Sequence, residues 1–90
     1  MKHATDSALD KLEDLLKEIR RLGVLKENKR GVFYLKSTAF LHFHEDPAGL
    51  FADLRIGKDF QRFSVSNLSQ QKAFLRKVKD TGKQFINNKE

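Results

Sequence analysis

Two histidines one residue apart, His42 and His44, are the side chains of this 90-residue chain that are best suited to chemistry. In a β-strand, residues two apart point to the same face and lie about 7 Å apart along the strand. Imidazoles at this spacing can share a zinc, nickel or copper ion when a third ligand joins them. Asp53 is the expected third ligand, because the turn geometry described below places it opposite His42. His42, His44 and Asp53 therefore form a candidate divalent-metal site.

The same residues offer less for catalysis. His42 oriented by Asp53 could act as a general base, and Arg55 or Arg62 could hold an anion. However, no serine or threonine has a specific spacing to this pair, and the chain has no cysteine. Its five glycines are isolated, so no phosphate-cradling loop is expected. With no third histidine close to the pair, ordinary surface histidines are the alternative, and we expect a binding protein rather than an enzyme.

The elements that must position these residues follow from hydrophobic periodicity. Apolar residues at three- and four-residue spacing predict a helix over about residues 7–22, which Gly23 ends. From residue 31 the spacing of apolar residues changes from the helical period to the two-residue period of a strand. Short aromatic and β-branched segments then predict strands over about residues 31–35, 39–45, 50–56 and 60–65.

A second helix is predicted over about residues 67–81, with Gln70 at its third position. Its buried stripe should consist of Leu68, Leu75 and Val78. Residues 87–90 are expected to form a loose tail, and residues 24–29 a further short strand or an extension of the first. The sequence thus predicts a single domain over residues 1–90 of the α+β class. It would be an antiparallel β-meander of three to five strands, flanked by an N-terminal and a C-terminal helix packed on one face.

Turn lengths determine which residues share a face of this sheet. A four-residue loop over 46–49 pairs Glu45 with Leu50, and a two-residue turn over 57–58 pairs Arg55 with Phe60. Both registers place the same apolar set on one face, which the helices should cover. That set consists of Leu41, Phe43, Leu50, Ala52, Leu54, Phe63 and Val65.

The opposite, helix-free face carries a mixture of aromatic and ionisable side chains. A contiguous aromatic patch with no predicted cover indicates a surface for a ligand, a protein partner or a second copy of the chain. A non-enzymatic binding module that uses this face is the leading interpretation of the sequence, and the metal site is its alternative. For the patch itself, the alternative is a half-exposed sheet surface stabilised by its own cross-strand pairs, or one covered by residues 24–30 or the C-terminal tail. The residues predicted to form this face are Phe40, His42, His44, Phe51, Asp53, Arg55, Phe60 and Arg62.

The net charge of +6 allows a third interpretation. After residue 66 six basic residues accompany two acidic ones, and a basic helix can contact nucleic acid. The signature of an RNA recognition motif is absent, and acidic residues dilute the field of the sheet face. A protein partner or self-association is therefore favoured over nucleic acid. The cations concerned are Lys72, Arg76, Lys77, Lys79 and Lys83.

The amino-terminal sequence MKHATDSALDKLEDLL places acidic residues where a signal peptide needs an apolar run. No apolar run approaches the length that spans a bilayer. These features predict a cytoplasmic protein without membrane contact.

The stretches GVFYLKSTAFLHFHEDPAGLFADLR and FQRFSV resemble a family of small, uncharacterised bacterial proteins, conserved hypothetical proteins with an AFLHFHEDPAGLFADLR core. The resemblance covers roughly residues 8–80. It implies a bacterial cytosolic protein, and it supplies no assigned activity and no catalytic residue.

Overall fold

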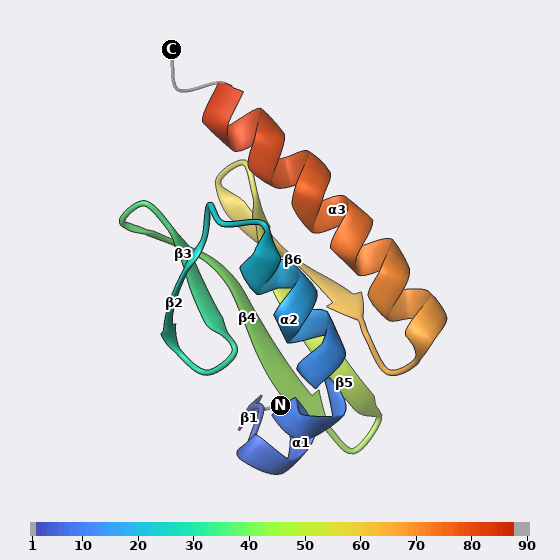
Figure 1. Cartoon of the computed structure of the whole chain (residues 1–90). Coiled ribbons are helices and arrows are strands. Elements are labelled where there is room, and N and C mark those ends of the chain that lie inside the picture. Colours follow the sequence, from blue (N-terminus) through green and yellow to red (C-terminus); the bar gives the residue numbers. More distant parts are fainter. Residues whose placement is uncertain (1, 88–90) are drawn as a thin grey trace.

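The chain folds into an antiparallel sheet with helices on one of its faces (Figure 1), as a computed structural model shows for residues 2–87, with side chains described through residue 83. Five strands follow one another in sequence order across the sheet, so each pairs with its neighbour in the chain. They are β2 (Lys26–Lys29), β3 (Val32–Leu35), β4 (Thr38–Asp46), β5 (Gly49–Ile56) and β6 (Asp59–Ser64). The predicted α+β class with an antiparallel meander is confirmed.

The amino-terminal segment differs from the prediction in two ways. A short strand, β1 (Lys2–His3), pairs with β4 beside β3, and nothing in its two residues signals it. The predicted helix over 7–22 is two helices, α1 (Asp6–Lys11) and α2 (Glu13–Arg21). Leu12 leaves the helical conformation between them but stays fully buried. The apolar spacing continues across this break, so periodicity alone could not reveal it.

The carboxy-terminal helix, α3 (Leu68–Asn87), is longer than predicted. Asn67 accepts a 2.8 Å hydrogen bond from the backbone N–H of Gln70, which caps the helix where the sequence indicated. The helix continues through Gly82, where the chain is buried, although a glycine inside a helix costs about 1 kcal/mol relative to alanine. The predicted tail therefore begins inside the helix, and positions 88–90 lie outside the described residues.

The core lies between the sheet and the helices α2 and α3, which run side by side across the same face (Figure 1). Of the predicted core set, Leu50 and Phe63 are partly buried and the other five are buried. On the predicted stripe of α3, Val78 is buried and Leu75 is partly buried. Leu68 is a correction, because it is 68% exposed at the first position of the helix, and Phe74 supplies a buried contact that was not predicted. Within residues 2–87, no helix is both long enough and apolar enough to cross a bilayer.

Phe40 is a second correction, and a β-bulge explains it. Pairing between β3 and β4 shifts after Phe33 pairs with Leu41, so that Tyr34 pairs with Ala39 and Phe40 is the extra residue. The bulge turns Phe40 into the core, where it is fully buried. The prediction that Phe40 lies on the helix-free face is therefore wrong, since strict alternation assumed an unbroken strand.

Candidate metal-binding site

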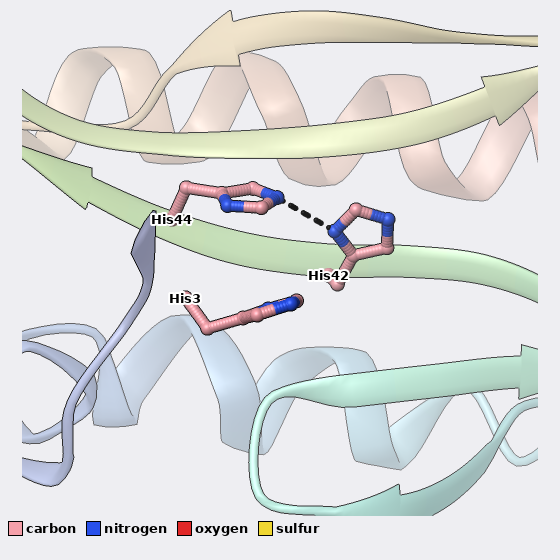
Figure 2. A group of neighbouring side chains, drawn as sticks. All are labelled: His3, His42 and His44. Carbon is pink, nitrogen blue, oxygen red and sulfur yellow. Dashed lines mark hydrogen bonds between the residues drawn. The ribbon is translucent and has the colours of Figure 1, made fainter. Parts of the chain in front are cut away.

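The alternation of β4 places its two histidines on the helix-free face. Leu41 and Phe43 point to the core, so His42 and His44 between and after them point the other way. The predicted register is confirmed here, because His42 pairs with Asp53 and His44 with Phe51. In Figure 2 the imidazoles of His42 and His44 stand on β4, with the helices behind the strands. The core thus fixes the direction of both rings.

The third histidine of the chain, His3, joins this pair, contrary to the sequence-based expectation. The pairing of β1 with β4 sets His3 opposite His44, and the two rings stack with centroids 4.9 Å apart. The centroid of His3 is also 5.9 Å from that of His42. One nitrogen from each of the three imidazoles lies within 4.8 Å of those of the other two. We call His3, His42 and His44 the histidine cluster (Figure 2).

Within the cluster, the Nδ1 of His42 and the Nε2 of His44 are 2.9 Å apart. At this distance one nitrogen donates its proton and the other accepts it. The same Nε2 of His44 is 3.2 Å from the Oδ2 of Asp53. Among the described side chains, the Nδ1 of His44 is the buried polar atom without a hydrogen-bond partner. At least one ring nitrogen of the cluster is therefore left without a hydrogen-bond partner among the described residues.

Asp53 lies beside the cluster but is committed to an arginine. The guanidinium of Arg62 donates from Nε to Oδ1 at 2.8 Å and from the second nitrogen to Oδ2 at 3.0 Å. Burial acts to raise the pKa of Asp53, but the hydrogen bonds and charge of Arg62 outweigh it and hold that pKa below its ordinary value. Asp53 is thus a paired carboxylate that borders His44, and His3 is the residue whose ring nitrogen lies close to those of both His42 and His44.

The surroundings of His42 favour its neutral form. Partial burial lowers the pKa of His42, and the neighbouring His44 lowers it further, outweighing the attraction of Asp53. The ring of Phe60 covers His42 with centroids 4.8 Å apart. A neutral imidazole keeps a free lone pair, which is the form that binds a metal ion.

The other predicted residues of the face are near the cluster without joining it. The guanidinium of Arg55 lies 4.6 Å from the ring centroid of Phe60. It also donates to the carbonyl of Ala39 at 2.7 Å and to that of Lys58 at 3.1 Å. Arg55 therefore holds the end of the sheet together. Phe51 is half-buried, and Phe60 is 36% exposed.

The described parts of the two segments that could have covered this face lie elsewhere. Residues 26–29 join the sheet as the edge strand β2, and α3 lies on the other face (Figure 1). The histidine cluster is therefore bordered by Phe60 and the pair of Asp53 with Arg62.

No family model, curated protein or solved structure gives a significant match to the chain. The resemblance to bacterial conserved hypothetical proteins therefore stays a prediction. Sequence reasoning found His42, His44 and their neighbours across the sheet but missed His3. A two-residue strand has no periodicity, so the only available signal was that the chain contains a third histidine.

Proposed function

We propose that this protein binds a transition-metal ion through His3, His42 and His44. The observation that carries the proposal is the convergence of three imidazole nitrogens within 4.8 Å, from strands about 40 positions apart in the sequence. A contact between two imidazoles stabilises a fold little when one ring is also open to solvent. Three nitrogen ligands, by contrast, are a donor set common to Zn²⁺, Cu²⁺ and Ni²⁺.

The geometry is close to what such an ion requires. A tetrahedral ion with nitrogen ligands at about 2.0–2.1 Å holds them about 3.4 Å apart. The Nδ1 of His42 and the Nε2 of His44 are already 2.9 Å apart, and His3 is exposed enough to rotate toward them. Three protein ligands leave a position for water or a small ligand. The Oδ2 of Asp53, fixed by Arg62, lies 3.2 Å from the same Nε2 of His44, so its negative charge would lie beside the ion.

The aromatic contact surface predicted from the sequence receives less support. Of its three phenylalanines, Phe40 is in the core, Phe51 is half-buried, and Phe60 alone is classed as exposed. A protein partner or a homodimer on this face remains a weaker proposal, in which Phe60 and Arg62 would be the contacts. Nucleic-acid binding by the exposed cations of α3, a cytoplasmic location and a bacterial origin also stay predictions from the sequence.

Titration calorimetry with Zn²⁺ tests the proposal on the full chain. Zn²⁺ is preferable to Cu²⁺, which binds many nitrogen-rich sites tightly. We expect one equivalent to bind, and we expect His42→Ala to weaken binding at least about 100-fold, since loss of a supporting residue alone costs about 10–100-fold. Asp59→Ala, an exposed carboxylate on β6, serves as the control and should leave the affinity unchanged.

The design is specific because all three histidines belong to the cluster and the chain has no cysteine. Zinc affinity that is unchanged in His42→Ala would therefore have to come from groups outside the cluster. That result, or the absence of binding to the unaltered chain, would contradict the proposal.

A further inference from the structure

The three ligands of the proposed site are not held equally. His42 and His44 stand on β4, which pairs with β5 along one edge and has its intervening residue Phe43 buried in the core. His3 stands on β1, which contains two residues, both of them exposed. An ion bound to all three would therefore connect a firmly packed strand to a weakly held one.

β1 is held by its two-residue pairing with β4 and by two hydrogen bonds from the residues that follow it. The backbone N–H of Ala4 donates to the carbonyl of Phe43 at 3.1 Å, and that of Thr5 donates to the Oε1 of Glu45 at 2.6 Å. The second bond is exposed, and so are the side chains of β1 itself. Short strands with little buried apolar area open with low free energies. The stacking of His3 on His44 adds one further contact.

β1 also covers part of the edge of β4 and forms one wall of a cavity. It continues the edge of β4 where β3 ends, since β3 pairs with β4 only as far as His42. Between β1, α1 and the turn joining β2 to β3 lies a cavity of about 550 Å³, lined by His3, Ala4, Tyr34 and Phe43 among others. If β1 detached, this cavity would lose one wall and β4 would present an unpaired backbone edge at residues 43–45.

We infer that the metal ion acts as a latch, fastening β1 to β4 through His3 and so controlling whether the edge of β4 is covered. The inference rests on the proposed metal binding and adds its consequence for the fold. Metal-binding free energy becomes ordering free energy wherever a ligand belongs to a segment that opens without it. By the same linkage, opening of β1 lowers the apparent affinity for the metal.

Amide hydrogen exchange followed by NMR tests the latch, on the full chain with and without one equivalent of Zn²⁺. The reporters are the amides of Ala4 and Thr5, and the amide of Leu54 on the central strand β5 is the internal reference. We expect Zn²⁺ to slow exchange of both reporters at least about tenfold relative to that reference, as closure of a local opening requires. The matched variant is His3→Gln, which keeps a polar side chain on β1 and removes the ligand.

In His3→Gln we expect weaker zinc binding through His42 and His44 and no slowing of the reporters. Calorimetry on the same samples separates the possible failures. If Zn²⁺ binds the unaltered chain but the reporters exchange at the same rate, the latch is wrong and the metal site stands. If Zn²⁺ slows the reporters equally in His3→Gln, the fastening does not pass through His3 and the latch is wrong. If no Zn²⁺ binds, the proposed function fails, and the latch fails with it.

Discussion

Two polar clusters on this small protein differ in how completely their groups are paired. Where α2 meets the β2–β3 hairpin, Arg20 donates to both oxygens of Glu27 and to one of Glu13, and Arg30 donates to the other oxygen of Glu13. Here basic groups alternate with acidic ones. In the histidine cluster, three groups of the same kind converge, and the Nδ1 of His44 is buried without a partner.

The difference in pairing supports different roles for the two clusters. Hydrogen bonds and charge from Arg30 and Arg20 lower the pKa of Glu13, and those of Arg20 lower the pKa of Glu27 against the effect of burial. The arginine–glutamate cluster is thus complementary without any added group, and it holds a helix to a hairpin. The three described residues of the histidine cluster include no such complement of opposite charge, and their imidazole nitrogens are the basis of the metal binding that we propose.

The largest expected effect separates binding from stability. His44→Ala should weaken Zn²⁺ binding at least about 100-fold while lowering the free energy of unfolding by only about 1 kcal/mol. The ring loses a modest hydrogen bond with His42 and a stack on His3, while Asp53 keeps its pair with Arg62. Calorimetry and urea denaturation of the metal-free protein measure the two quantities. A loss of several kcal/mol with unchanged zinc affinity would make the cluster a structural one.

A substitution in the arginine–glutamate cluster should instead lower stability without changing zinc binding. Glu27→Ala leaves Arg20 without one carboxylate and the backbone N–H of Gly31 without its 3.0 Å acceptor. We expect the free energy of unfolding to fall by about 1–2 kcal/mol and zinc affinity to stay constant. Arg21→Ala is the control, because its pair with Glu18 is exposed and should contribute less than about 0.5 kcal/mol. Equal losses in Glu27→Ala and Arg21→Ala would show that the arginine–glutamate cluster stabilises the fold no more than an exposed ion pair does.

Much of this arrangement could be predicted from the sequence, because it depends on alternation and turn length. The loop over 46–49 and the turn over 57–58 gave the register that sets His42 beside Asp53 and Asp53 beside Arg62. Two features could not be predicted for physical reasons. The bulge at Phe40 interrupts the alternation without a glycine or proline to mark it, and β1 depends on tertiary pairing rather than on any local pattern.

A smaller effect tests the role of Asp53 beside the ligands. Asp53→Asn keeps the shape of the side chain but removes its charge and one acceptor for Arg62. We expect zinc affinity to fall about tenfold, because the substitution removes a negative charge beside the ion. Calorimetry on this variant distinguishes the roles: a loss as large as that of His44→Ala would make Asp53 a direct ligand, and no loss would make its place beside His44 incidental.

The smallest expected effects lie in the pH dependence of stability without metal. The folded pKa of His42 is lowered from 6.5, so the unfolded chain binds its proton more readily and stability declines as the pH falls from about 6.5 toward the folded value. The lowered carboxyl pKa values of Glu13 and Glu27 give stability that is present above their ordinary 4.5 and is lost at lower pH.

The two clusters should therefore weaken in separate pH ranges, which urea denaturation at a series of pH values resolves. His42→Ala should remove its share of the decline near pH 6 and leave the decline below pH 4.5 unchanged. A decline near pH 6 that is the same in this variant would show that His42 does not cause it.

The most direct test of the account is to follow the ring nitrogens of all three histidines by ¹⁵N NMR during a zinc titration. These are the only imidazoles in the chain, so each signal reports a proposed ligand. We predict that His3, His42 and His44 shift together and that all three saturate at one equivalent of Zn²⁺. Shifts confined to His42 and His44 would remove His3 from the site, and three unchanged imidazoles would contradict metal binding by the cluster.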